Sequence, residues 1–235
     1  MIRIEQLHKL FGKLHVLKGV NISFNKQEVA CIIGPNGSGK STLIKCILGM
    51  NIPNEGNILI NHQNINREFE YRRNIGYMPQ IGSYPENIKM GQLFDMMKDL
   101  RKPFSTLDED LVHQFKLSEM FNKPMGTLSG GTIQKVSAAL AFLFNPNILI
   151  LDEPTAGLDP VAVEILKEKI KLEKQKDKTI IITSHIMPEV EEIADTVIYI
   201  LEGVIRFNKT IPQIKIETQE EKFSKAISKI LINHS

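Results

Sequence analysis

The chain has 235 residues, of which 42% are hydrophobic and 24% are charged, and its formal net charge is +2 at pH 7. This composition is ordinary for a soluble globular protein, and so small a net charge does not favour nucleic-acid binding. No apolar run approaches the roughly 18 residues of a membrane-spanning helix, and the first residues do not resemble a secretory signal. We therefore expect a chain that neither crosses a membrane nor binds nucleic acid.

The first 60 residues contain several strand patterns. Residues 2–7, 20–24 and 56–60 are short candidates that suit an antiparallel flap. Residues 29–33 are a continuous apolar run, which is typical of a strand buried in a parallel sheet. Cys31 in this run and Cys46 beyond it have neither a C-x-x-C spacing nor an extracellular context, so we expect buried, reduced thiols.

A phosphate-binding loop follows the strand at 29–33 directly. It reads Gly34, Pro35, Asn36, Gly37, Ser38, Gly39, Lys40, Ser41 and Thr42, which matches G-x-x-x-x-G-K-[ST]. Glycines let the backbone curl around phosphates, the Lys40 charge suits their oxygens, and the Ser41 hydroxyl can bind Mg²⁺. The alternative is a glycine turn that caps an ordinary helix. The strand before the loop and a predicted helix over 41–48 favour the phosphate loop.

The middle of the chain has helical periodicity from residue 89 to residue 145. Within it, Leu128, Ser129, Gly130 and Gly131 open a predicted helix over 132–144. A serine N-cap followed by two glycines makes a second helix N-terminus that suits an anion.

An acidic pair follows the next buried strand pattern, residues 147–151. Asp152 and Glu153 could divide Mg²⁺ binding from the orientation of an attacking water. The alternative is a solvated acidic turn before Pro154. The presence of a phosphate loop in the same chain favours the functional interpretation. Apolar runs near residues 148, 180 and 197 alternate with helical segments, which predicts a parallel α/β core.

Together these segments resemble an ABC-type ATPase subunit over residues 1–210. The resemblance identifies residues 34–42 as Walker A, 128–131 as the signature motif and 148–153 as Walker B. It implies an α/β fold, with a P-loop NTPase parallel-sheet core, an antiparallel β subdomain and an inserted α-helical subdomain at about 82–145. Residues 211–235 are then a C-terminal amphipathic helical tail. Within it, the segment 217–231 predicts one helix with an apolar face.

Four further positions match the family, although each has a structural alternative. Gln80 corresponds to the Q-loop glutamine but could be an ordinary loop amide. Phe11 stands where an aromatic stacks on adenine but could belong to the core. His185 corresponds to the switch histidine but, as a lone histidine after a strand, could be a structural residue; its place one helix and one strand after Glu153 favours the functional role. Asp159 belongs to the D-loop, and before Pro160 it also suits a helix N-cap. The chain departs from the family at Thr132, where glutamine is usual, which places one contact to the partner's nucleotide in doubt.

The resemblance implies ATP hydrolysis by a head-to-tail dimer, either a homodimer or a pair with another ABC ATPase subunit. Each ATP would lie between Walker A of one chain and the signature motif of the other. Glu153 would position water, while Lys40 and His185 would contact the γ-phosphate. Ser41, Asp152 and Gln80 would hold Mg²⁺. ATP binding would thus close the dimer, and hydrolysis would open it.

The family mostly drives integral membrane permeases from the cytoplasmic face, where we expect this chain to be peripheral. The predicted docking surface is apolar and comprises Tyr84, Pro85, Met90, Phe94, Met96 and Met97, although most of these side chains could instead belong to the core. Residues 125–141 also resemble the ATPase of the copper-processing ABC system that matures nitrous-oxide reductase. The alternative is a soluble ABC-type ATPase that assists metallocentre assembly without transport.

Overall fold

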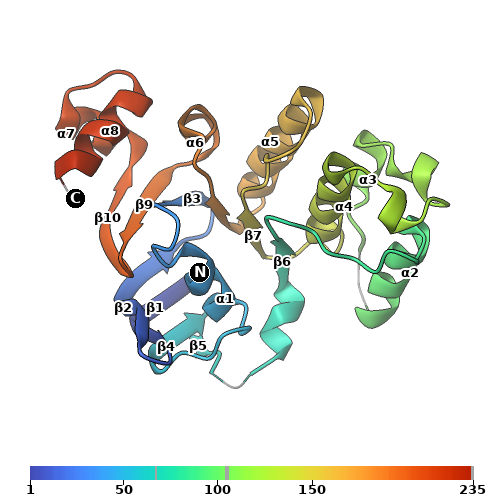
Figure 1. Cartoon of the computed structure of the whole chain (residues 1–235), viewed down its shortest axis with the longest axis horizontal. Helices are drawn as coiled ribbons and strands as arrows, with labels where there is room; N and C mark the ends of the chain where they lie inside the picture. The colour runs from blue at the N-terminus through green and yellow to red at the C-terminus, as the bar shows by residue number, and fades with distance from the viewer. Residues whose placement is uncertain (67, 104–105, 234–235) are drawn as a thin grey trace.

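The computed structural model describes residues 1–66, 68–103 and 106–233 and contains two β-sheets (Figure 1). The larger sheet has the strand order β10-β9-β3-β8-β7-β6. These strands are β3 (Glu28–Ile33), β6 (Ile75–Met78), β7 (Ile148–Asp152), β8 (Thr179–Thr183), β9 (Thr196–Leu201) and β10 (Val204–Thr210). All neighbours pair in parallel except β9 and β10, which are antiparallel. The predicted α/β core with a parallel sheet is confirmed.

The smaller sheet is antiparallel and has the order β2-β1-β4-β5. Its strands are β1 (Ile2–Phe11), β2 (Leu14–Phe24), β4 (Glu55–Ile60) and β5 (Gln63–Asn64). The flap predicted from residues 2–7, 20–24 and 56–60 is therefore confirmed, with longer first and second strands. Helix α1 (Lys40–Ile47) packs between the two sheets, because its buried side chains share one apolar core with β1, β2, β3 and β4.

Side chains of β3 alternate between two cores, as a strand covered on both faces requires. Ala30 and Ile32 face the core around α1, whereas Cys31 and Ile33 face the core that contains the remaining large helices. Both cysteines are buried free thiols. Burial raises the pKa of Cys31, and burial raises the pKa of Cys46 to about 11, so both thiols stay protonated near neutral pH.

The helical insertion lies at the far right of Figure 1, beyond β6. It contains α2 (Met90–Leu100), α3 (Asp110–Gln114) and α4 (Gly130–Phe142). Two short 3-10 turns, Leu117–Met120 and Met125–Thr127, connect α3 to α4. Helix α4 begins two residues before the predicted bound at 132, because Ser129 caps it through a 3.2 Å bond from the Thr132 N–H.

Helices α5 (Pro160–Gln175) and α6 (Met187–Ile193) cover the sheet on the same side as the C-terminal helices α7 (Ile211–Thr218) and α8 (Phe223–Asn233). The single helix predicted over 217–231 is wrong. Gln219 adopts a left-handed conformation (φ 56°) that ends α7, and a turn precedes α8. Phe223, Ile227 and Ile230 are nevertheless buried, as their spacing predicted. The division at residue 210 stays a prediction.

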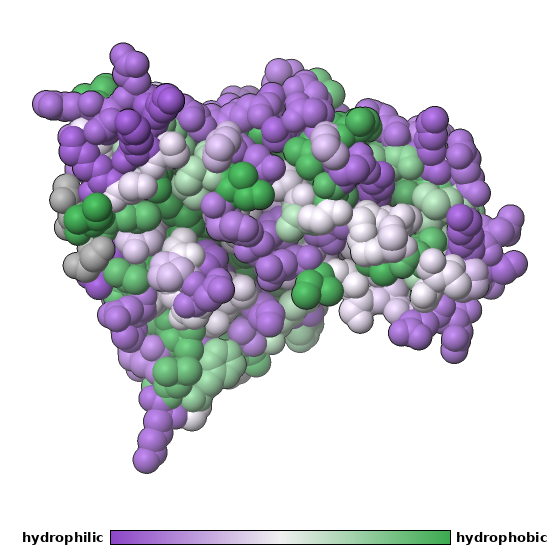
Figure 2. All heavy atoms as spheres, turned by 45° about the horizontal axis from the view of Figure 1, so that its top comes forward, coloured by the Kyte–Doolittle hydropathy of each residue, from purple (hydrophilic) through white to green (hydrophobic). Residues whose placement is uncertain are grey.

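The surface mixes hydrophilic residues with smaller groups of hydrophobic residues, as Figure 2 shows for one face. Among the described residues, no helix is long and apolar enough to cross a membrane.

Candidate nucleotide-binding and hydrolysis site

The loop between β3 and α1 requires glycine at two positions, because a side chain at either would clash with neighbouring atoms. Gly34 has φ 153°, and a Cβ atom there would lie 2.2 Å from the carbonyl oxygen of Ile200. Gly39 has φ 112°, and its Cβ would lie 2.9 Å from Cδ2 of Leu17. The loop can therefore curl tightly before α1, which begins at Lys40, one residue before the predicted helix.

The Lys40 ammonium lies across this loop. Its Nζ donates to the carbonyl oxygens of Gly34 at 2.6 Å and Pro35 at 3.0 Å. Burial lowers the pKa of Lys40, and the nearby carboxylates of Glu153 and Asp152 partly oppose this effect. The ammonium thus lies against the backbone of the glycine-rich loop, and Lys40 lines the cavity described below. The buried Ser38 hydroxyl has no partner among the described residues, so the loop has a hydroxyl group that is free to form a hydrogen bond.

The acidic pair lies at the carboxyl end of β7, beside β8. The Thr183 hydroxyl donates to Oδ1 of Asp152 at 2.5 Å. Burial raises the pKa of Asp152, while the bond from Thr183 opposes the rise. Glu153 has φ 49°, an uncommon conformation for a residue other than glycine, and its N–H donates to the Thr183 hydroxyl at 2.9 Å. The same threonine therefore fixes both carboxylate residues.

Glu153 and His185 come together from different loops. Nδ1 of His185 lies 3.3 Å from Oε2 of Glu153, and the histidine side chain is 69% exposed. The structure thus joins two residues that the sequence placed 32 positions apart. The Glu153 side chain is much less exposed than that of His185, at 18%.

A cavity of about 360 Å³ joins these elements. It is lined by Phe11, Leu14, Val16, Asn36, Gly37, Gly39, Lys40, Ser41, Thr42, Gln80, Asp152 and Glu153. Phe11 is 47% exposed, so it is available for stacking and is not a core residue. Sequence reasoning missed Leu14 and Val16. Their place just after the β-turn that follows Phe11 was the available signal, because a hairpin brings such residues to one edge.

The signature residues Ser129, Gly130 and Gly131 do not line this cavity. They lie at the start of α4, which Figure 1 places apart from α1. Ser129 Oγ lies 2.9 Å from the Thr132 hydroxyl, so the unusual threonine contacts the signature serine. The two candidate phosphate-binding loops therefore do not line the same cavity within one chain.

The signature helix is tied to the rest of the chain through two residues that the sequence analysis did not select. Gln134 is buried, and its Nε2 donates to the carbonyl oxygen of Gln80 at 3.3 Å. Lys135 Nζ lies 2.6 Å from Oδ2 of Asp159, which also caps α5 through the Ala162 N–H at 3.0 Å. The predicted N-cap role of Asp159 is thus confirmed.

Comparison with known proteins decides the family. Residues 17–156 match the family model described as ABC transporter. The chain belongs to the ABC transporter ATP-binding family. It is 34% identical over 212 residues to a lantibiotic transport ATP-binding protein of Streptococcus pyogenes, an alignment that covers 89% of this chain and 90% of the relative. As an ABC cassette, the chain binds and hydrolyses ATP.

Solved structures agree with this assignment. The structure of an ATP-binding subunit of an ABC transporter superposes with a TM-score of 0.90 at 26% identity, covering 98% of this chain and 99% of the other. A dimeric structure of a bacterial ABC transporter cassette superposes with a TM-score of 0.79 at 25% identity, covering 89% and 98%. The predicted ABC cassette fold is confirmed.

A second cavity, of about 330 Å³, lies between the helical insertion and the larger sheet. Met50, Arg72, Tyr84, Met97, Arg101 and Phe144 are among its lining residues. We call it the insertion groove. For two of the residues that could form either a docking surface or the core, the structure shows the core, since Met90 is 0% and Phe94 is 2% exposed. They pack inward because α2 presents one apolar face to the insertion's own core.

Proposed function

We propose that two copies of this chain close head to tail around ATP and drive a membrane permease. The observation that carries the proposal is the separation of the two candidate phosphate-binding loops. The cavity of Lys40, Asp152 and Glu153 does not include Ser129, so a second chain must supply the signature residues. The solved dimer of a related cassette supports this arrangement.

Within one chain, residues 34–42 would hold the phosphates through backbone N–H groups, and Lys40 would neutralise their charge. The residues present fit Mg²⁺, because Ser41, Gln80 and Asp152 line one cavity and supply the oxygen ligands that this ion prefers. Bound there, Mg²⁺ would neutralise charge on the phosphate oxygens.

Glu153 would orient the attacking water. His185, which contacts Glu153 but does not line the cavity of Lys40 and Glu153, would reach the γ-phosphate from the edge of that cavity. The 3.3 Å contact between Nδ1 of His185 and Oε2 of Glu153 holds the imidazole beside the carboxylate. Phe11, with Leu14 and Val16 beside it, would form the apolar wall for the adenine ring. This wall is built on the hairpin of the antiparallel sheet.

The partner chain would complete the site with Ser129, Gly130, Gly131 and Asp159. The glycine N–H groups and the Ser129 hydroxyl lie at the N-terminus of α4, where the helix dipole favours an anion. Hydrolysis would remove the γ-phosphate contacts and so open the dimer.

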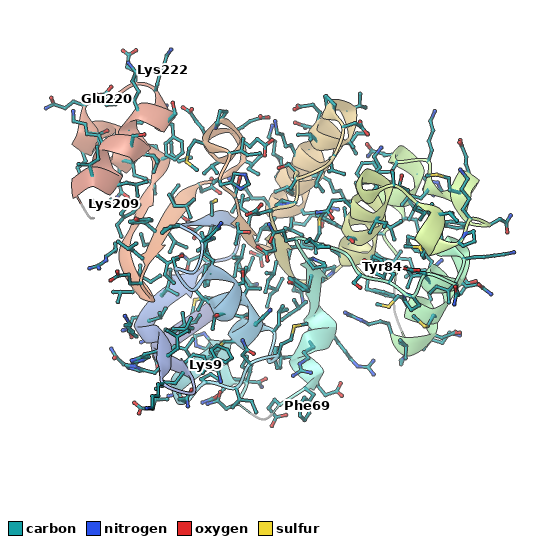
Figure 3. All side chains as sticks on the ribbon, in the orientation of Figure 1. Lys9, Phe69, Tyr84, Lys209, Glu220 and Lys222 are labelled. Atoms are coloured by element: carbon teal, nitrogen blue, oxygen red, sulfur yellow. The ribbon has the colours of Figure 1, made fainter. Side chains whose placement is uncertain are left out.

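The insertion groove is our candidate for the permease contact, and the chain would then be peripheral on the cytoplasmic face of the membrane. The groove is mostly apolar, and Tyr84 lies in it at the side of the helical insertion (Figure 3). The lantibiotic transport function named for the relative from Streptococcus pyogenes supports a transport role. The specific assignment to copper processing rests on residues 125–141 and stays a prediction, as does the alternative of a soluble assembly ATPase.

The test of closure is Glu153→Gln with size-exclusion chromatography in saturating Mg-ATP. This variant should bind ATP, lose turnover by about 10² to 10³, and accumulate as a dimer, because the phosphate-binding loop stays while the water-orienting carboxylate is lost. Lys40→Ala is the matched control and should stay monomeric, since it weakens that loop itself. Turnover at the parent rate in Glu153→Gln would remove Glu153 from this role.

A further inference from the structure

The C-terminal end of the phosphate-loop helix is held by two consecutive side chains from a distant segment. The segment is the 3-10 turn η1 (Glu70–Asn74), which leads directly into β6 and then to Gln80. The Tyr71 hydroxyl donates to the carbonyl oxygen of Ile47 at 3.2 Å, and Nη2 of Arg72 donates to that of Gly49 at 2.9 Å. The carbonyl group of Ile47, the last residue of α1, has no partner within the helix, so the bond from Tyr71 satisfies it. The bond from Arg72 satisfies the carbonyl group of Gly49, two residues beyond the helix.

The fit at this contact is tight. A Cβ atom at Gly49 would lie 2.5 Å from the Tyr71 hydroxyl and 2.6 Å from Nη2 of Arg72. The Arg72 guanidinium also stacks on two rings, 5.0 Å from the centroid of Phe69 and 5.9 Å from that of Tyr71. A displacement of Arg72 must therefore move the backbone at Gly49 or break its bond.

Arg72 is also shared by two cavities. It lines the insertion groove and also a third cavity, of about 420 Å³, whose other lining residues include Cys46, Gly49, Ile52 and Phe69. Figure 3 shows Phe69 at the outer edge of the molecule beside this segment, and its side chain is 66% exposed. A molecule that enters the insertion groove thus contacts a side chain whose other partners lie at the end of α1.

One further feature marks Arg72 as able to rearrange. Its Nε atom is buried and has no hydrogen-bond partner among the described residues. A buried donor without a partner is unfavourable. A second position of the Arg72 side chain in which Nε finds a partner would gain the free energy of that hydrogen bond. Helix α1 has eight residues and is therefore only about 12 Å long. We expect it to move as one rigid body, so a displacement of the backbone at Gly49 would also displace Lys40.

From these contacts we propose that Tyr71 and Arg72 are positioning residues that transmit occupancy of the insertion groove to the phosphate loop through α1. The inference rests on the proposed permease contact. The occupant is a segment of the membrane permease, since the groove walls include Met50, Met97 and Phe144, whose apolar surface suits a buried protein segment. Arg72 acts on turnover through the position of α1 and does not touch the nucleotide cavity.

The experiment uses the full chain with its neighbouring membrane protein in liposomes, and it measures the ratio of partner-stimulated to basal ATP turnover. In Arg72→Ala this ratio should fall by about tenfold, and in Tyr71→Phe by several-fold, which lies in the usual range of coupling between sites. Arg72→Lys should give an intermediate ratio. Arg73→Ala is the control of equal charge change, because Arg73 pairs with Glu70 on the surface, and its ratio should match the parent.

A purely structural role would lower both rates together and leave the ratio unchanged, and that result overturns the inference. Should Arg72→Ala fail to fold, Tyr71→Phe decides alone, since it removes one hydroxyl and keeps the ring. Co-sedimentation with the liposomes is measured in parallel. A parent chain that never binds the membrane protein contradicts the transporter role, whereas normal binding with a normal ratio in both variants contradicts only the coupling.

Discussion

Lys135 Nζ lies 2.6 Å from Oδ2 of Asp159, and this pair joins the signature helix to the D-loop of the same chain. The bond from Lys135 is the largest cause that holds the pKa of Asp159 below its usual value. Asp159 also caps α5, so the two helix N-termini that would face the partner in the proposed dimer are joined to each other. Both contacts to the partner's nucleotide would then form in one step.

We therefore expect Lys135→Met to reduce steady-state ATP turnover by about tenfold while leaving the ATP affinity of the monomer unchanged. The reason is that the variant disturbs the closed pair and not the single-chain cavity. Lys171→Met is the control, because Lys171 pairs on an exposed face of α5. A lower ATP affinity in Lys135→Met would contradict this prediction, because it would show that Lys135 affects nucleotide binding by the single chain and not only dimer closure.

Thr132 contacts Ser129 through their hydroxyl groups, 2.9 Å apart. Because Ser129 and the glycine N–H groups remain available, we expect Thr132→Gln to change turnover by less than about tenfold. Ser129→Arg should block closure by filling the anion site, as size-exclusion chromatography with ATP would show. A hundredfold loss in Thr132→Gln would reveal a role for the threonine beyond holding Ser129.

Much of the nucleotide cavity was predictable because its residues follow strands directly. Walker A follows β3 and the acidic pair ends β7, and the carboxyl ends of neighbouring parallel strands meet at one edge. Phe94 shows where such reasoning stops. Apolar periodicity gives the apolar face of α2 but not which neighbour covers it, so the sequence could not decide between a docking surface and the core for Phe94, which is buried.

The polar contacts between distant elements could not be predicted from the sequence pattern either. Gln134 and Lys135 look like ordinary polar helix residues, and their partners, Gln80 and Asp159, lie 54 and 24 positions away. Likewise, no local signal predicted that Gln219 would end α7, because a left-handed glutamine is uncommon. Long-range polar pairing depends on tertiary placement, which periodicity does not encode.

The insertion groove gives a prediction about docking. Met97→Glu places a charge in the apolar groove and should weaken co-sedimentation with the membrane partner by about tenfold or more. Met96→Glu is the matched control, since Met96 is its neighbour on α2, is 43% exposed and does not line the groove. Phe94→Glu should instead destabilise the fold by more than about 4 kcal/mol, because it buries an unpaired charge. Equal loss in Met96→Glu and Met97→Glu would argue against the groove.

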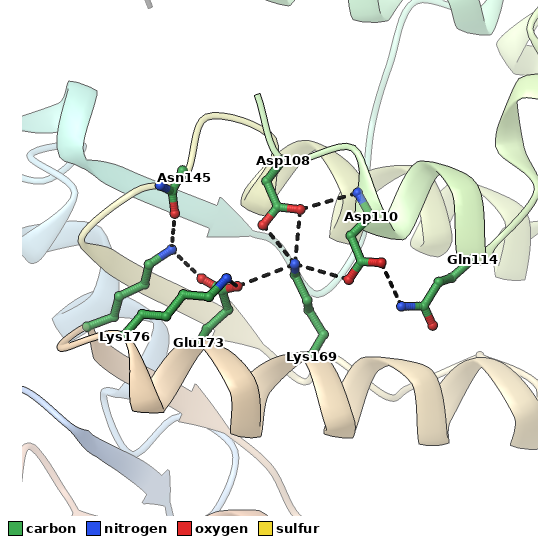
Figure 4. Close-up of polar contacts among 8 residues, drawn as sticks. Asp108, Asp110, Gln114, Asn145, Lys169, Glu173 and Lys176 are labelled. Atoms are coloured by element: carbon green, nitrogen blue, oxygen red, sulfur yellow. Dashed lines mark hydrogen bonds and ion pairs between the residues drawn. The ribbon is translucent and has the colours of Figure 1, made fainter. Parts of the chain in front are cut away.

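A buried ionic network holds the helical insertion to α5 (Figure 4). Lys169 is 4% exposed, and its Nζ lies 2.7 Å from Asp108, 3.1 Å from Asp110 and 3.3 Å from Glu173. Glu173 is fully buried and also pairs with Lys176 at 2.7 Å and with Lys178. Burial alone would raise the pKa of Glu173, but the bonds from Lys176 and Lys178 outweigh it, so the pKa lies below 4.5.

We expect Lys169→Met to lower the free energy of unfolding by about 3 to 5 kcal/mol, because three carboxylates lose their shared cation in a buried site. Urea titration followed by circular dichroism would measure this loss. Lys171→Met is the control and should cost less than about 1 kcal/mol, since exposed pairs contribute little.

The same network fixes the direction of the pH dependence. The pKa of Glu173 is lower in the folded chain than in the unfolded chain, so its contribution to stability is present when the pH lies well above the pKa of the unfolded glutamate. That contribution is lost as the pH falls through the unfolded and then the folded pKa. Glu173→Gln should therefore have a shallower fall in unfolding free energy between pH 5 and pH 3 than the parent. Parallel curves for the two proteins would show that Glu173 is not the group that titrates.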